Sequence, residues 1–299
     1  MNRSMTWDII IPQSEGPKRL ENFLKKHFPI GYIRKLFRKN GVRLNGKRCG
    51  PDETARPGDR VALFIPFEER PNTGKKQRLL RAAFGVLFED DDILLINKHA
   101  GIAVHEGKEI LKSRSILGML EATYRSRGIV PKLVHRIDKE TSGLLVVAKS
   151  DSAVEDLEDK FETGEVEKEY LTLVIGRLYP KQGGIDFPLP GRAGRPVPAL
   201  THYKVERELP ATSLVRVKIE TGRMHQIRLH FAQLGHPVVM DDEHGDFAFN
   251  KRFRKRYGLK RQFLHASSVA FELRGKKRKW TAPLADDLTQ TLRSLGEDV

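Results

Sequence analysis

A short stretch near the middle of the chain, residues 133–150, constrains the fold most strongly. Its second half, Gly143 to Ala148, is a continuous apolar run that contains two leucines and two valines. Such a run predicts a strand that is buried on both faces. Its first half is densely polar and reads H-R-I-D-K-E-T-S at residues 135–142. A buried strand fed by a charged loop is a place where a fold can hold a reactive side chain rigidly.

Asp138 is the residue of this loop with the clearest potential for chemistry. A carboxylate can act as a nucleophile or as a base. The simpler interpretation is that Asp138 caps a turn and pairs with Arg136 or Lys139. The loop by itself leaves both interpretations open.

The charge balance indicates a polyanionic partner. The 299 residues carry a formal net charge of +15, of which +11 falls in residues 1–83 and only +4 in the remainder. A surplus concentrated in one segment favours a nucleic-acid-binding region there, although an anionic membrane surface also attracts such charge. The alternative is a solvated basic surface with no partner.

Several classes of protein are disfavoured by what the sequence lacks. The sequence contains no run of 18 apolar residues, so no membrane span is predicted, and the first residues lack the apolar core of a signal peptide. Cys49 is the only cysteine, which excludes an internal disulfide and fits a reducing cytoplasm. Five histidines lie between residues 225 and 265, but no H-E-x-x-H or cysteine pair accompanies them, so we predict no metal site. No G-x-G-x-x-G or phosphate-binding loop is present, and Ser142 lacks a nucleophile elbow, so neither a nucleotide cofactor nor a hydrolase triad is expected.

The first 66 residues predict a small module of two helices and short strands. Apolar spacing predicts helices at residues 18–27 and 32–38, the second ending at Asn40-Gly41. G-x-V-x-x-N-G-K and P-G-D-x-V follow, and the whole pattern resembles the small S4-like RNA-binding module shared with a small-subunit ribosomal protein. The resemblance implies that basic residues of the second helix and of the following hairpin contact phosphates. These residues are Arg34, Lys35, Arg38, Arg43 and Lys47. Residues 67–83 are expected to form a basic linker.

The remaining residues, 84–299, alternate between strand and helix patterns. V-L-F and I-L-L-I-N predict a β-hairpin, and residues 152–162 predict an acidic amphipathic helix. A strand is expected at residues 166–175, carrying Tyr170, and two more at residues 201–206 and 213–220. Residues 177–200 predict loops and short edge strands, and residues 246–262 form a strongly basic insertion.

Four motifs of this region, in order, resemble the large pseudouridine synthase family that modifies ribosomal RNA. They are N-K with G-I-A-V-H, then H-R-I-D-x-x-T-S-G-L-L, then K-x-Y-L-x-L-V-x-G, then T-G-R-x-H-Q-I-R-x-H. The chain departs from the family at His99, where proline is usual, and at His244-Gly245, where Y-G is usual. D-D-x-x-G-D followed by the basic insertion is most similar to the branch that acts on 23S rRNA.

The resemblance implies a fold and a set of roles. The fold is α+β, with a mixed, mainly antiparallel central sheet in a catalytic domain of residues 84–299. Asp138 is implied to be catalytic, Arg228 to be the cation that keeps it ionised, and Tyr170 to stack on the target base. Arg136 is implied to fill the space that the extruded uridine leaves. The expected partner is 23S rRNA or a pre-ribosomal particle, with no cofactor, no metal and no membrane, and the protein is expected to be a cytoplasmic monomer.

Other interpretations stay open at this point. A nucleosidase could pair Asp138 with Glu140, and would release free uracil. An RNA-binding assembly factor could rely on residues 1–66 without essential catalysis, and a synthase could act on tRNA instead. Arg228 could be a strand residue paired with another acid, and Tyr170 an ordinary half-buried tyrosine. Whether Asp138 attacks the sugar or removes its 2′ proton is also undecided.

Overall fold

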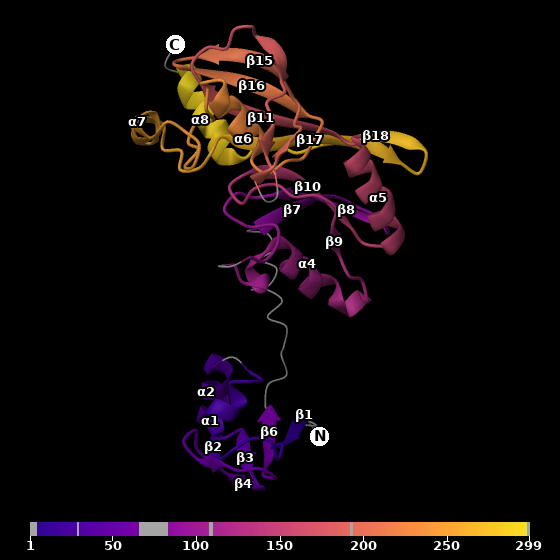
Figure 1. Ribbon diagram of the computed structural model, residues 1–299, viewed down its shortest axis with the longest axis vertical. Helices are drawn as coiled ribbons and strands as arrows, with labels where there is room; N and C mark the ends of the chain where they lie inside the picture. Colours follow the sequence, from indigo (N-terminus) through magenta and orange to yellow (C-terminus); the bar gives the residue numbers. More distant parts are fainter. Residues whose placement is uncertain (1–4, 29, 66–82, 108–109, 192–193, 298–299) are drawn as a thin grey trace. The chain divides into compact units, whose positions relative to one another are not determined.

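The computed structural model of the protein describes residues 5–28, 30–65, 83–107, 110–191 and 194–297 (Figure 1). The chain divides into two compact units, residues 1–76 and residues 77–299. The predicted linker at residues 67–83 lies outside the described residues except for Ala83. Within the described part of the chain, no helix is long and apolar enough to cross a membrane.

The apolar run of residues 143–148 forms strand β10 (Ser142–Ala148), and all seven of its residues are buried. β10 pairs antiparallel with β8 (Ile93–Lys98) along its length. On its other side it pairs in parallel with β17 (Leu264–Leu273) at two positions only. The predicted strand, buried on both faces, is therefore confirmed, and it lies inside the sheet of the second unit.

Gly143 explains why a glycine begins this apolar run. Its φ is +107°, a conformation that side-chain-bearing residues rarely adopt. A Cβ built on Gly143 would lie 2.2 Å from the carbonyl oxygen of Ala266 on β17. Only glycine therefore lets β10 and β17 approach closely where the loop that carries Asp138 joins the sheet.

The sheet of the second unit has ten strands and is mixed but mainly antiparallel, as predicted. Its main path runs β12-β15-β16-β11-β17-β10-β8-β7, with β18 beside β17 and β9 beside β10, and β10–β17 is the parallel pair. A separate two-stranded ribbon joins β13 and β14. The bounds not yet given are β7 (Phe84–Glu89), β9 (Lys132–Leu133), β11 (Glu167–Ile175), β12 (Gln182–Ile185), β13 (Leu189–Pro190), β14 (Pro196–Val197), β15 (Thr201–Leu209), β16 (Thr212–Ile219) and β18 (Lys276–Thr281).

The helices of this unit begin and end at recognisable caps. Ser150 and Asp246 accept hydrogen bonds from backbone amides at the starts of α5 (Asp151–Thr163) and α7 (Phe247–Tyr257). The predicted acidic helix is thus confirmed as α5, and the basic insertion folds largely as α7. The other helices are α4 (Ile116–Tyr124), α6 (Gln226–Gln233), α8 (Asp286–Glu297) and the 3-10 turns η1 (Lys112–Arg114) and η2 (Arg125–Arg127).

Two apolar clusters hold these layers together. The larger lies around β8, β10, β11 and β17 and contains Phe231 of α6. The smaller brings Phe253 of α7 and Phe263 together with Leu288 and Leu295 of α8. α6 packs against β15, and α7 packs against α8. The basic insertion is therefore anchored by its apolar side to the C-terminal helix.

The first unit is built on a four-stranded antiparallel sheet in the order β1-β6-β3-β4. Phe23 of α1 and Ile33 and Leu36 of α2 are buried in its core. Asn45 and Gly46 join β3 to β4 with φ values of 51° and 80°, so the predicted Asn-Gly turn is present. The elements are β1 (Met5–Ile10), β2 (Lys18–Arg19), α1 (Leu20–Leu24), α2 (Ile30–Arg38), β3 (Val42–Leu44), β4 (Lys47–Arg48), β5 (Thr54–Ala55) and β6 (Arg60–Ile65).

Helix α2 presents Arg34, Lys35 and Arg38 to solvent on the side opposite its apolar residues. We call these three residues the basic face of α2. Lys47 is exposed in β4, and the guanidinium of Arg43 in β3 lies 4.3 Å from the centre of the Phe64 ring.

Candidate active site

A cleft of about 610 Å³ opens in the second unit beside the end of the loop that precedes β10. Residues 134–138 line one side of it, and residues 219–228, from the end of β16 into α6, line another. Lys168 and Tyr170 of β11 also contribute to its wall. The motifs that the sequence singled out, far apart along the chain, thus meet at one concavity.

Asp138 lies in this cleft with its side chain 21% exposed. Its backbone carbonyl accepts a hydrogen bond from the Thr141 amide at 3.1 Å, which closes a turn. Below the loop, Lys98 is fully buried and its Nζ donates to the carbonyls of His99, Ile102 and Lys139, each at 2.9 Å. Lys98 therefore ties the residue that follows Asp138 to the β8 end of the sheet.

Burial lowers the pKa of Lys98 to about 7, although the negative charge of Glu140 opposes the shift. Three carbonyl acceptors match the three N–H donors of the ammonium form. In the ammonium form, each donor of this buried group is therefore paired with a carbonyl in or beside the Asp138 loop.

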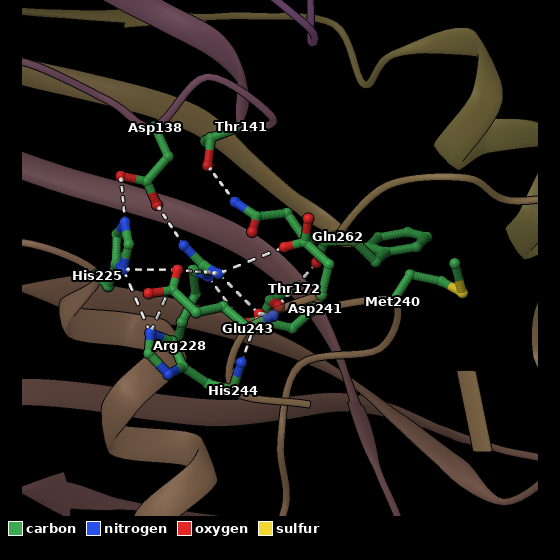
Figure 2. A network of polar contacts seen from close by, with 12 residues as sticks. Asp138, Thr141, Thr172, His225, Arg228, Met240, Asp241, Glu243, His244 and Gln262 are labelled. Carbon is green, nitrogen blue, oxygen red and sulfur yellow. Dashed lines mark hydrogen bonds and ion pairs between the residues drawn. The ribbon is translucent and has the colours of Figure 1, made fainter. Parts of the chain in front are cut away.

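Arg228 reaches Asp138 from helix α6, so the strand position that the sequence left open is wrong, whereas the pairing with another acid that went with it is present. Its Nη1 lies 3.5 Å from Asp138 Oδ2. Its closer partner is Asp241, which it contacts with two hydrogen bonds, at 2.6 Å from Nε and 2.7 Å from Nη2. Arg228 is thus shared between a fully buried carboxylate and the partly exposed one in the cleft, as Figure 2 shows.

The pKa values of the Arg228–Asp241 pair shift in the directions of a stable ion pair. Burial alone would raise the pKa of Asp241, but hydrogen bonds from Arg228 and from the amides of His244 and Glu243 hold that pKa below its usual value. Burial would likewise lower the pKa of Arg228, and the Asp241 carboxylate outweighs it and raises that pKa. Both groups are therefore charged at neutral pH, and the guanidinium keeps a fixed place beside Asp138.

Tyr170 lies on β11 and is 8% exposed, and it lines the same cleft as Asp138. Burial, followed by the negative charge of Asp138, raises the pKa of its hydroxyl well above the usual range. The side chain is therefore a neutral phenol near neutral pH, with a ring available to a ligand in the cleft.

Arg136 also lines the cleft and is exposed, with its Nη1 3.3 Å from His105 Nε2. Its neighbour His135 has a different role. The His135 Nε2 accepts a hydrogen bond from the Val146 amide at 2.8 Å, and its ring stacks on Phe161. His135 is thus part of the support for β10, while Arg136 faces the opening.

Glu140 and Ser142, considered for a nucleosidase and for a hydrolase, are not placed to act with Asp138. Glu140 does not line the cleft; its carboxylate lies 3.9 Å from Lys139 Nζ. Ser142 is buried and bonds to His265 at 2.9 Å and to Arg261 at 3.1 Å. Neither side chain is arranged to share chemistry with Asp138.

Sequence reasoning did not single out three residues beside Asp138 and Arg228: His225, Glu243 and Asp241. The ring Nε2 of His225 lies 3.8 Å from Asp138 Oδ1, and Glu243 Oε2 lies 3.3 Å from Arg228 Nη2. Asp241 is the first residue of the D-D-x-x-G-D pattern, and Glu243 is its third, at an unspecified position. Its connection to Arg228 was invisible because 13 residues and a change of element separate them.

Known proteins resemble this chain in sequence and in fold. A sequence profile of the RNA pseudouridylate synthase family matches residues 92–233. The chain is 34% identical to "Ribosomal large subunit pseudouridine synthase C" of Salmonella typhimurium, covering 96% of each protein. It is 35% identical to the protein of the same name of Haemophilus ducreyi, covering 95% of this chain and 94% of that protein. The structure titled "Human RNA Pseudouridylate Synthase Domain Containing 4" shares the fold, with a TM-score of 0.63 and 22% identity over 75% of this chain and 96% of that one.

Proposed function

The chain belongs to the RNA pseudouridine synthase family and is an RNA pseudouridine synthase, an isomerase; from this premise we propose that its substrate is 23S ribosomal RNA, alone or in a pre-ribosomal particle. The relatives that cover almost the whole chain carry the large ribosomal subunit in their names. The observation that carries the proposed mechanism is the meeting of Asp138, Tyr170 and Arg228 around one cleft.

In the proposed reaction, Asp138 acts on the sugar of the target uridine. The bond between the base and the sugar breaks and is remade through carbon 5 of the base, with no redox change. A carboxylate is suited to this as the nucleophile at the sugar or as the base that removes the 2′ proton. Both routes start from ionised Asp138, and the guanidinium of Arg228 at 3.5 Å supplies the opposite charge. No cofactor is needed for either route.

Tyr170 is proposed to hold the base while it turns. A neutral phenol ring stacks on a pyrimidine, and its hydroxyl donates a hydrogen bond. Because the pKa of Tyr170 is raised, the resting hydroxyl does not itself act as a base toward the carbon 5 proton. We propose that the hydroxyl instead assists the removal of that proton through a hydrogen bond.

Arg136 is proposed to occupy the space that the extruded uridine leaves in the RNA. It is exposed at the opening of the cleft, two residues before Asp138. A target in folded RNA must leave its stack to reach a side chain inside a cleft. A long cationic side chain at the rim can replace the base and contact neighbouring phosphates.

The first unit is proposed to be an S4-like RNA anchor. We keep the division into an RNA-binding module of residues 1–66, a basic linker of residues 67–83 and a catalytic domain of residues 84–299. The support is the charge of +11 on residues 1–83 and the exposed basic face of α2. Arg43 and Lys47 extend the proposed phosphate contact. We further propose that the protein works as a cytoplasmic monomer.

The experiment that tests the substrate is a map of pseudouridine in cellular RNA. Cells lacking the protein should lose pseudouridine at specific positions of 23S rRNA, and the wild-type gene should restore them. Loss in tRNA alone would favour the tRNA alternative. Unchanged modification together with defective ribosome assembly would favour an assembly factor.

A further inference from the structure

Three potential metal ligands meet at the rim of the cleft: His225, Glu243 and His244. His225 Nδ1 lies 3.2 Å from His244 Nε2 and 3.3 Å from Glu243 Oε2, and His244 Nε2 lies 3.7 Å from the same oxygen. Figure 2 shows the three side chains turned toward one another. In the part of the chain that the structure describes, these three residues each offer one ligand atom, and the three atoms lie within 4.8 Å of one another, close enough to hold one ion.

The spacing suits a tetrahedral ion. Zinc binds imidazole nitrogen and carboxylate oxygen at about 2.0–2.2 Å, which places neighbouring ligands of a tetrahedron about 3.3–3.5 Å apart. The three distances of 3.2, 3.3 and 3.7 Å lie close to that spacing. Two imidazoles and one carboxylate fill three positions and leave the fourth open to water, a ligand set typical of zinc.

The backbone around these ligands is built firmly. His225 is the residue at the start of α6 and adopts a left-handed conformation with φ of 52°. The amides of Glu243 and His244 both donate to Asp241 Oδ1 at 3.0 Å, and Asp241 is clamped by Arg228. The same ion pair that fixes the active-site guanidinium therefore also fixes two of the three ligands.

Access and ligand support are both present. The side chains of His225 and His244 are 22% and 21% exposed, and that of Glu243 is 55% exposed, so an ion can enter from solvent. The second ring nitrogen of His225 faces Asp138 Oδ1 at 3.8 Å. A histidine that binds metal through one nitrogen commonly donates its other N–H to a carboxylate, and here that carboxylate is Asp138.

We propose that His225, Glu243 and His244 form an inhibitory site for zinc or a similar divalent transition metal at the edge of the active-site cleft. Bound metal fixes His225 with its Nε2–H toward Asp138, and this N–H then occupies the carboxylate that the reaction needs. Bound metal also draws Glu243 away from Arg228; without metal, Glu243 Oε2 lies 3.3 Å from Arg228 Nη2. The inhibitory consequence rests on the proposed function, whereas the binding of metal does not.

His244 is the residue that completes the group, and it gives the sharpest variant. The sequence resembles a family in which tyrosine is usual at this position, so His244→Tyr removes a ligand with a side chain that the fold is expected to accept. Glu243→Gln removes the carboxylate ligand while keeping its shape. The matched control is His202→Gln, because His202 pairs with Glu220 at 2.7 Å and, among the described residues, belongs to no group of three possible ligands.

The binding test uses the full chain freed of metal by chelation and titrated with zinc against a chromogenic chelator, without RNA. We expect one zinc per wild-type chain and no change in His202→Gln. The affinity should be at least about tenfold lower in His244→Tyr and Glu243→Gln, because losing a ligand should cost no less than losing a residue that supports one. Cobalt should give the visible absorption of a tetrahedral site in the wild type and not in His244→Tyr. Absence of stoichiometric binding, or binding that His244→Tyr leaves unchanged, overturns the site and indicates a hydrogen-bonded histidine pair.

The inhibition test measures turnover of rRNA with added zinc, relative to the same variant without zinc. Wild type should lose activity as the site fills, and His244→Tyr should not. Zinc acting on the RNA itself would reduce both equally, which overturns the inhibitory role, as does zinc binding without loss of turnover. An inactive wild type that still binds zinc through His244 would refute the proposed function and leave the metal site standing.

Discussion

Arg228→Ala tests the arrangement around Asp138 quantitatively. The substitution removes both hydrogen bonds to Asp241, whose side chain is fully buried, and leaves that carboxylate without its counter-charge. Removing one partner of a buried pair typically costs about 3–5 kcal/mol. In a unit of this size each kcal/mol lowers the melting temperature by about 2–4 °C, so we expect a drop of roughly 6–20 °C. Turnover should also collapse, because Asp138 loses its nearest cation.

Arg228 should stabilise the fold mainly through its pairing with Asp241 and only slightly through Asp138. In an Asp241→Asn background the uncompensated charge is absent, so Arg228→Ala should cost about 1–3 kcal/mol less than in the wild type. In an Asp138→Asn background the destabilisation caused by Arg228→Ala should fall by less than about 1 kcal/mol, because Asp138 is 21% exposed and lies 3.5 Å from Arg228. Denaturant unfolding at pH 7 of the singles and doubles measures both couplings.

The pH dependence of this coupling follows from the lowered pKa of Asp241. A carboxyl whose pKa is lower in the folded state stabilises the fold above its unfolded pKa, near pH 4, and loses that contribution as the pH falls further. The coupling should therefore be complete at pH 7 and shrink in acid. Arg216→Ala, which breaks an exposed pair with Glu206, is the control and should cost less than about 1 kcal/mol. Additive energies for Arg228 and Asp241 would show that these two side chains do not form a stabilising pair.

Three further predictions concern other parts of the chain. Replacing the basic face of α2 by alanines should weaken rRNA binding and flatten the slope of log K against log salt by up to about two to three units, with little change in single-turnover rate at saturating RNA; unchanged affinity and slope would point to α7 instead. Gly143→Ala should destabilise the second unit by about 2–4 kcal/mol, since the new Cβ meets Ala266 at a positive φ, whereas Gly85→Ala in open space should not. The pKa of Lys98 is about 7 in the folded protein, below its ordinary value of 10.5, so the unfolded chain binds more protons between pH 7 and 10.5. The free energy of unfolding should therefore rise with pH in this range, and Lys98→Met should remove that rise. An identical pH profile for both proteins would show that Lys98 does not titrate in this way.

The central strand and the helix α5 could be predicted because their patterns are local. Residues 143–148 are apolar without interruption, and residues 152–162 repeat with helical spacing, so neither depends on a distant partner. The turn at Asn45-Gly46 was equally readable, since few other residue pairs adopt two successive positive φ values.

The details of the site could not be predicted in the same way. Helix α6 has only two turns, and its polar residues Gln226, Arg228 and His230 are buried by tertiary contacts, so its periodicity is hidden. The pairing of Arg228 with Asp241 and the meeting of His225 with His244 depend on how the loop after α6 folds back. The resemblance indicated Asp138, Tyr170 and Arg228 as a set, but the side chains that orient them become visible only in the folded structure.

Pseudouridine formation on 23S rRNA by Asp138→Asn shows whether the Asp138 carboxylate carries out the reaction. Asparagine keeps the shape of the side chain and removes its charge, so the variant should fold and bind RNA as the wild type does while forming no pseudouridine. Glu140→Gln is the matched control, because it removes a carboxylate of the same loop that does not line the cleft, and it should retain turnover. Turnover of Asp138→Asn near the wild-type rate would show that the Asp138 carboxylate is not the catalytic group, and release of free uracil by the wild type would indicate a nucleosidase.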